Sequence, residues 1–167
     1  MKLGVVAGNL KPRSKTLQAA LTLGRSLNIS DPHVVIDAVD LGDALFDRNS
    51  PLLKHAINMI LSCDVTIFAS PTYKASYSGI LKLLLDQIPS DGLKGMVALP
   101  LMLGAGTSHS LAADVLLKPV LVELGAICPV RGLYLLESET ESSEVLDDWL
   151  ARAKPVISAL VCEGSDQ

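Results

Sequence analysis

Five short runs of β-forming residues alternate along the chain with longer runs of helical spacing, and this alternation restricts the fold more than any other feature. Consecutive parallel strands need a crossover helix, so the pattern predicts a doubly wound α/β fold with helices on both faces of a five-stranded parallel sheet. For the strand order 2-1-3-4-5, ligands are expected at the carboxyl edge, in the loops after strands one, three and four. The five runs lie at residues 2–7, 33–39, 64–70, 95–104 and 126–136.

Helical spacing fills the stretches between these runs, and prolines mark where it should be disturbed. Ser50 followed by Pro51 is a strong helix-start signal, with Ser50 as the N-cap. Pro119 predicts a kink or an altered turn near residues 114–118, and Pro155 should interrupt the last helix. Pro100 has no evident place inside a strand. The helical patterns cover residues 14–27, 50–63, the end of 69–89, 108–125 and 142–161.

Length and composition predict a single domain over residues 1–167, with a frayed tail at about 163–167. Hydrophobic residues make up 49% of the chain and aromatic residues only 4%, and the mean hydropathy is +0.40. The core should therefore be built mainly from Leu, Val, Ala and Ile. Such an aliphatic bias suits a parallel sheet that is covered on both faces.

Charge and cysteine content narrow the expected partners and location. The net charge is −4 and no basic run stands out, so nucleic acid and anionic membranes are not expected as partners. No apolar run approaches the ~20 residues that a membrane span needs, and residues 1–8 are too short for a signal sequence. The widely spaced cysteines Cys63, Cys128 and Cys162 are expected to be buried free thiols rather than metal ligands. A cytoplasmic protein is therefore expected.

The loop after the first strand run, "GNLKPRSKT" at residues 8–16, combines hydroxyl and basic side chains at a helix N-terminus. It lacks the further glycines of a dinucleotide-binding fingerprint and of a P-loop. Backbone N–H groups and the helix dipole favour an anion there, which predicts a site for a single phosphate. The alternative is that Ser14 is only an N-cap. The side chains in question are Lys11, Arg13, Ser14, Lys15 and Thr16.

The loop after the third run begins the stretch "SPTYKASYSGILKLLLDQIP" at residues 70–89. Pro71 is expected to end the strand ladder and to leave backbone groups that could bond the polar edge of a flat heterocycle. Tyr73 and Lys74 would flank that heterocycle. The alternatives are that Tyr73 is a half-buried packing residue and that Lys74 is a solvated surface charge.

The loop after the fourth run is "GAGTSH" at residues 104–109. Gly104 and Gly106 would let the backbone approach a ligand closely, and Thr107 or Ser108 would open the next helix. His109 stands where a dinucleotide fingerprint needs its third glycine. It is expected to be a structural first-turn residue rather than an acid or base.

Together the three loops resemble those of the NADPH-dependent FMN reductase family of flavodoxin-like proteins. Within that family the chain is most similar to the sulfonate-utilisation FMN reductases of two-component monooxygenase systems. The resemblance rests on "GNLKPRSKT", "SPTYKASYSGILKLLLDQIP" and "GAGTSHSLAADVLLKPVLVELGA", and it extends from residue 1 to about residue 135. The second segment is the most specific, because its Ser-Pro-x-Tyr and Ser-Gly-x-Leu-Lys elements are hard to obtain together by chance.

The resemblance implies a flavin site made of all three loops. Ser14 and Thr16, with Lys11 or Lys15 nearby, would hold the FMN phosphate. The isoalloxazine ring would be bordered on one side by Pro71, Thr72, Tyr73 and Lys74. The other edge of the ring would lie against Gly104, Ala105, Gly106 and Thr107.

The resemblance also implies an NAD(P)H-dependent FMN reductase, with FMN and NADPH or NADH as cofactors and a flavin-dependent monooxygenase as a possible partner. The flavin would carry the chemistry, so no catalytic side chain and no metal site are expected. Two alternatives stay open. One is a flavoprotein quinone or azo reductase with tightly bound FMN, and the other is a non-enzymatic flavodoxin-like electron carrier.

Assembly is the last expectation. The helical pattern "LAADVLLKPVLVEL" is apolar around most of its circumference, which fits burial on two sides. The resemblance implies a homodimer or homotetramer, which this pattern supports. The alternative is a core helix with one modestly apolar outer face. Relatives often carry a tyrosine near the flavin in this helix, at the place where this chain has Val115.

Overall fold

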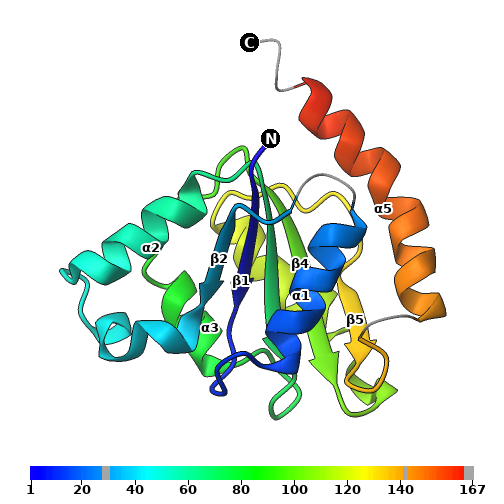
Figure 1. The fold of residues 1–167 in the computed structure, drawn as a ribbon, viewed down its shortest axis with the longest axis horizontal. Helices are drawn as coiled ribbons and strands as arrows, with labels where there is room; N and C mark the ends of the chain where they lie inside the picture. The colour runs from blue at the N-terminus through cyan, green and yellow to red at the C-terminus, as the bar shows by residue number, and fades with distance from the viewer. Residues whose placement is uncertain (28–30, 141–142, 164–167) are drawn as a thin grey trace.

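The computed structural model describes residues 1–27, 31–140 and 143–163. Its strands form one parallel sheet in the order β2-β1-β3-β4-β5, which confirms the predicted flavodoxin-like topology. All the arrowheads point to the lower edge of the sheet in Figure 1. The strands are β1 (Leu3–Ala7), β2 (Val34–Asp37), β3 (Val65–Pro71), β4 (Val97–Gly104) and β5 (Leu133–Leu136).

Helices cover both faces of the sheet, as predicted (Figure 1). Helices α1 (Lys15–Ser26) and α5 (Glu144–Glu163) lie on one face. The 3₁₀ segment η1 (Ala38–Phe46), α2 (Pro51–Leu61), α3 (Gly79–Leu85), the π-helical segment η3 (Ala113–Leu117) and α4 (Lys118–Glu123) lie on the other. A short 3₁₀ turn, η2 (Thr107–His109), follows β4. The segment η1 was not predicted, and β2 is shorter than the run 33–39.

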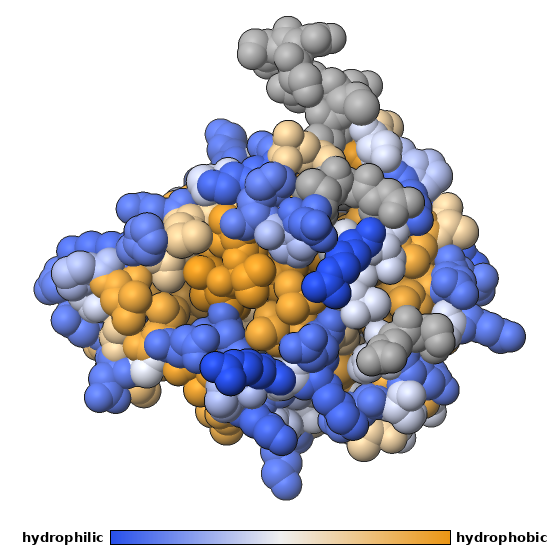
Figure 2. Space-filling view, in the orientation of Figure 1, coloured by the Kyte–Doolittle hydropathy of each residue, from blue (hydrophilic) through white to orange (hydrophobic). Residues whose placement is uncertain are grey.

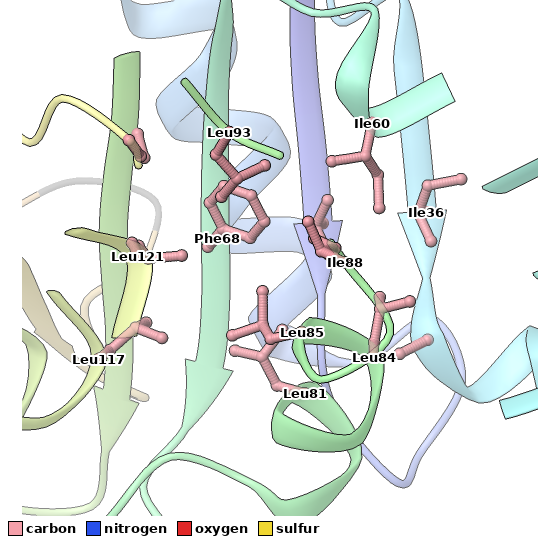
Figure 3. Packing of buried hydrophobic residues seen from close by; sticks show 14 of the residues in the cluster. Ile36, Ile60, Phe68, Leu81, Leu84, Leu85, Ile88, Leu93, Leu117 and Leu121 are labelled. Atoms are coloured by element: carbon pink, nitrogen blue, oxygen red, sulfur yellow. The ribbon is translucent and has the colours of Figure 1, made fainter. Parts of the chain in front are cut away.

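The core on the α3 side holds the carboxyl edge of the sheet in place. Phe68 of β3 is fully buried, and it packs among leucines from α3, η3 and α4 (Figure 3). Leu81, Leu84 and Leu85 recur at helical spacing, so one face of α3 is apolar and lies on the sheet. This packing places the N-terminus of α3 beside the ends of β1 and β3.

Pro100 fits the sheet because β4 has no neighbour on one side at that point. The Ala98 N–H points toward the β5 side, where it bonds the Ile127 carbonyl at 2.9 Å, and a proline two residues later lacks its donor on the same side. Pairing with β5 begins only at Leu101.

The predicted fifth strand at 126–136 was therefore too long. Ile127 forms only an isolated bridge to Val97, and the chain then leaves the sheet until Leu133. Side chains satisfy the backbone in between: Lys118 Nζ donates to the Val130 carbonyl and Trp149 Nε1 to the Arg131 carbonyl.

The helices after β4 and β5 depart from their predictions in opposite ways. The altered turn expected from Pro119 is confirmed, because residues Ala113–Leu117 are π-helical. The stretch 108–125 is thus divided into separate segments instead of one helix. In contrast, α5 continues through Pro155, so the predicted interruption was wrong. Buried Trp149, Ala153 and Ile157 hold α5 on the sheet, while water can reach the exposed turn that the proline deprives of one hydrogen bond.

Other expectations concern caps, thiols and surface. Ser50 occupies the N-cap of α2 but makes no capping side-chain bond. Cys63 is buried and Cys128 is only half-buried, and neither forms a disulfide. Burial raises the pKa of both thiols, that of Cys128 to about 11. The side chain of Cys162 and the predicted frayed residues 164–167 lie outside the described part.

Some apolar side chains reach the surface. Val35, Phe46 and Leu52 are exposed, and Figure 2 shows apolar surface between α1 and α2, in front of the sheet edge formed by β2. No helix in the described part of the chain combines the length and the apolar character needed to cross a membrane.

Candidate functional site

The three loops predicted to form the site meet at the carboxyl edge of the sheet (Figure 1). The Gly8 N–H bonds the Ala69 carbonyl at 2.9 Å, which joins the first loop to β3. The Thr72 N–H bonds the Leu103 carbonyl at 2.6 Å, which joins the second loop to β4. The site therefore lies at the switch point between β1 and β3, where doubly wound sheets bind their ligands.

The first loop has the composition of an anion site. Ser14 caps α1, because its Oγ accepts from the Leu17 N–H at 3.3 Å. The flanking cations Lys11, Arg13 and Lys15 are exposed, and within the described ranges none of them forms an ion pair with a carboxylate. A helix N-terminus with unneutralised cations around it favours a bound anion such as a phosphate.

Asp37, at the end of β2, holds this loop through a hydrogen bond, and it was not predicted from the sequence. Its Oδ2 accepts from the Arg13 N–H at 3.0 Å, and Arg13 has a φ of 50°, in the left-handed region. Burial raises the pKa of the Asp37 carboxyl, while the bond from Arg13 opposes that shift. The other carboxylate oxygen has no partner among the described residues. Asp37 thus fixes the turn that presents the cations.

Ser78 joins the first two loops, and it was also missed. In a regular parallel ladder the Gly8 carbonyl would accept from the N–H of residue 71, but Pro71 has none. The Ser78 Oγ donates to that carbonyl instead, at 2.6 Å. The same oxygen accepts from the Leu81 N–H at 3.3 Å and so caps α3. Ser78 is 1% exposed, so water cannot replace it.

The variant Ser78→Ala is expected to lose about 2–3 kcal/mol of unfolding free energy. The change removes a helix cap, worth about 1 kcal/mol, and leaves a buried carbonyl unsatisfied, which costs about 1–2 kcal/mol more. Urea unfolding followed by circular dichroism measures the effect. Ser62→Ala, at an exposed helix end, is the control and should change stability much less. Equal losses in the two variants would contradict this role for Ser78.

β3 ends at Pro71, as predicted, but the prediction that Pro71 leaves backbone groups free for a ligand was wrong. Pro71 is buried, pairs with Leu103 and is the last residue of β3. Its carbonyl accepts from the Ser70 hydroxyl at 2.8 Å. Its missing donor lies on the β1 side, where the Ser78 hydroxyl donates to the Gly8 carbonyl in its place. The backbone groups around Pro71 are therefore used within the protein, and the outward-facing part of this loop lies beyond Thr72.

That outward part is a tight hairpin. Tyr73 and Ser76 bond each other in both directions, at 2.8 and 3.1 Å, and Lys74 and Ala75 form the turn with φ values of 51° and 66°. Positive φ at both central positions is the signature of a type I′ turn, which normally takes Asn and Gly. Lys74 is exposed at the tip, and Tyr73 bonds the first loop through its hydroxyl.

The variant Ala75→Gly is expected to raise the unfolding free energy by about 1 kcal/mol, because glycine adopts a positive φ without the steric cost that alanine has. Thermal unfolding at fixed pH tests this. Ala151→Gly, on the exposed face of α5, is the matched control and should instead lose about 1 kcal/mol. A loss of stability in Ala75→Gly would show that the turn is not left-handed.

The third loop leaves β4 at Gly104, whose carbonyl still accepts from the Glu137 N–H at 3.0 Å. Ala105, Gly106 and Thr107 are exposed, and Thr107 begins η2. Tyr134 of β5 holds this loop, because its hydroxyl donates to the Gly106 carbonyl at 2.8 Å. His109 is exposed in η2, in agreement with its expected place in a first turn.

The side-chain oxygen of Thr72 lies between the second and third loops. It is buried and has no hydrogen-bond partner within the described ranges. Buried polar groups in native proteins nearly always have a partner. A polar group of a ligand between these loops can complete this site, which fits the predicted place of a heterocycle.

A separate cleft of about 480 Å³ lies between β5 and α5. It is lined by Trp149, Arg131 and Arg152, among others, and reaches Ser110, the residue that follows the third loop. None of the residues predicted for the site lines it. The three loops therefore form a surface of their own at the end of the sheet.

Comparison with known proteins identifies the family of this chain. A family model described as NADPH-dependent FMN reductase matches residues 1–141. The chain belongs to the NADPH-dependent FMN reductase family. The matched range includes all three loops.

Individual members of the family show different degrees of similarity. An FMN reductase (NADPH) of Escherichia coli is 44% identical over 106 residues, which are 63% of this chain and 53% of that protein. An FMN reductase (NADPH) of Pseudomonas aeruginosa is 32% identical over 157 residues, or 88% of this chain and 83% of that protein. The chain thus spans about half the length of the Escherichia coli relative.

A solved structure supports the fold. The apo form of an NADH:FMN oxidoreductase (EMOB) superposes with a TM-score of 0.82 at 32% identity, over 92% of this chain and 86% of that one. The sequence-based family assignment is therefore confirmed together with the topology.

Proposed function

We propose that this protein is an NAD(P)H-dependent FMN reductase. The main support for the proposal is that three segments meet at the switch point of the sheet. They are the first loop (residues 8–16), the hairpin of the second loop (73–76) and the third loop (104–109). Family membership and the names of the relatives support the same activity. When bound, FMN would supply the redox chemistry, accepting a hydride from NADPH or NADH.

The residues present fit FMN. Lys11, Arg13 and Lys15 carry positive charge at the N-terminus of α1, where the phosphate would bind together with Ser14 and Thr16. Thr72, Tyr73 and Lys74 would border one edge of the ring, above the buried Pro71. The other edge would lie against Gly104, Ala105, Gly106 and Thr107. These residues bind and orient the flavin, and none of them is needed as an acid or base.

The test is oxidation of NADPH and of NADH with FMN, FAD, riboflavin or a quinone as acceptor, with and without added flavin. We expect the rate of NAD(P)H oxidation to depend on added FMN. The variant Lys11→Gln/Arg13→Gln/Lys15→Gln should raise the KM for FMN at least about tenfold, because each charge-assisted bond contributes about 1.5–3 kcal/mol. Riboflavin, which has no phosphate, should be little affected.

The control for the triple variant is a lysine far from the three loops. Lys54→Gln, on α2 and away from the loops, should leave the KM for FMN unchanged. Turnover independent of added FMN would instead indicate a quinone or azo reductase with bound flavin. Bound flavin without any NAD(P)H oxidation would indicate an electron carrier.

We also propose that reduced FMN passes to a flavin-dependent monooxygenase, and that the protein acts as a homo-oligomer. The resemblance to two-component systems supports the first. Exposed Leu111, Val115 and Val122 support the second, because they present apolar surface along the stretch that contains η3 and α4. Analytical ultracentrifugation that finds only a monomer would contradict the oligomer.

A further inference from the structure

We propose that Asn9 is a positioning residue that couples the phosphate end of the flavin site to its ring end. The inference rests on the proposed function, since it concerns the same site. Asn9 directly follows Gly8 and is 7% exposed. Its side-chain amide contacts three groups, which belong to Lys11 and Thr16 in the first loop and to Tyr73 in the second.

The orientation of the Asn9 amide follows from one of these contacts. The Lys11 backbone N–H lies 3.0 Å from Oδ1, and a main-chain N–H can only donate. The atom that it meets must therefore be the amide oxygen. The Tyr73 hydroxyl, 3.1 Å from the same oxygen, must also donate to it. The amide nitrogen consequently faces Thr16, at 3.1 Å.

This orientation sets the direction of the Thr16 hydroxyl. Because the amide nitrogen donates to Thr16 Oγ1, the hydroxyl proton must point elsewhere. Thr16 is in the first turn of α1 and is 1% exposed, so its side chain cannot turn freely into water. A threonine that keeps its proton available can donate to a phosphate oxygen bound at the N-terminus of α1.

At the other end, Asn9 holds Tyr73 and with it the strained hairpin of residues 73–76. Lys74 and Ala75 both have positive φ, and such turns persist only when surrounding contacts fix them. The bond from the Tyr73 hydroxyl reaches 64 positions along the chain. One buried amide thus sets both the donor at the phosphate and the position of the loop that borders the ring.

Three single variants and the double variant Asn9→Ala/Tyr73→Phe separate the two ends. Tyr73→Phe removes only the hairpin bond, Asn9→Asp keeps the two acceptor contacts but loses the donor to Thr16, and Asn9→Ala removes everything. Dissociation constants for FMN and riboflavin are measured by quenching of flavin fluorescence in each. Tyr77→Phe is the matched control in the same loop, and circular dichroism checks that each variant is folded.

The expected results follow from the contacts. Tyr73→Phe should weaken FMN and riboflavin alike, about fivefold, as the loss of one hydrogen bond implies. Asn9→Asp should weaken FMN about tenfold more than riboflavin, because a carboxylate repels phosphate and accepts the Thr16 proton. Asn9→Ala/Tyr73→Phe should bind FMN within about twofold of Asn9→Ala. Tyr77→Phe should behave as the unaltered protein.

Several outcomes would refute the role of Asn9. If the losses of Asn9→Ala and Tyr73→Phe multiply, or if Asn9→Asp affects both flavins equally, the coupling is refuted. A protein that binds neither flavin would refute the proposed function, and with it this role. Amide hydrogen exchange in the flavin-free protein is the independent readout. Ser76 should exchange faster in Asn9→Ala and Tyr73→Phe but not in Asn9→Asp, and unchanged exchange in Asn9→Ala would refute the link to the hairpin.

Discussion

The variant Gly8→Ala is expected to lose about 3 kcal/mol of unfolding free energy and most of its affinity for flavin. A Cβ at residue 8 would overlap the Cβ of Leu81 and lie 2.8 Å from the Leu81 Cα. Leu81 is fully buried in α3, so backbone and not a flexible side chain would have to move. Overpacking of this kind costs typically about 1–3 kcal/mol. Because Gly8 begins the first loop, a shift of its backbone would also move that loop away from Ser78.

The matched control is Gly79, in α3, the helix that Gly8 faces. A Cβ at Gly79, the first residue of α3, would meet nothing within 4 Å. Gly79→Ala should therefore be neutral or stabilising by up to about 1 kcal/mol, as expected when alanine replaces glycine in a helix. Urea unfolding and FMN titration of both variants check the pair. If Gly8→Ala had the same unfolding midpoint as the unaltered protein, the close approach of Gly8 to Leu81 would be contradicted.

The topology could be predicted from the sequence because the three central strands are short, mainly apolar runs that are buried along their whole length. All residues of β1, β3 and β4 are buried, so hydrophobic runs separated by helical patterns were sufficient. The ends of elements were predicted less well. The effect of a proline depends on the segment that its missing N–H faces, as at Pro100, Pro71 and Pro155. Sequence rules that consider only adjacent residues cannot identify that segment.

The same limit applies to the site. Its loops were predictable, because glycines, hydroxyls and cations gather after the ends of strands. Asn9 and Ser78 lie inside the quoted loops but were not selected, since the contacts that join them to another loop reach Tyr73 and Gly8, 64 and 70 positions away. Asp37 and Tyr134 hold the loops from β2 and β5 in the same way. Supporting residues of this type become visible only when the sheet brings the loops together.

The two glycines of the third loop are expected to respond differently to alanine. A Cβ at Gly104 would overlap the Tyr134 hydroxyl and lie 2.7 Å from the ring carbon that bears it. Tyr134 is buried and bonded to Gly106, so Gly104→Ala should lose about 2–3 kcal/mol of unfolding free energy. Adding Tyr134→Phe removes the overlapping oxygen and should recover part of the loss. A double variant as unstable as the sum of the singles would contradict this contact.

Gly106→Ala should leave folding stability within about 0.5 kcal/mol of the unaltered protein. A Cβ there would meet nothing within 4 Å, and the φ of −156° is extended backbone that any residue adopts. The fold therefore does not require glycine at this position, whereas a flat ligand lying against the loop would. We expect Gly106→Ala to weaken FMN and riboflavin equally, at least about tenfold, because its added methyl group would meet the ring and not the phosphate. Undiminished binding of both flavins would place the ring away from this loop.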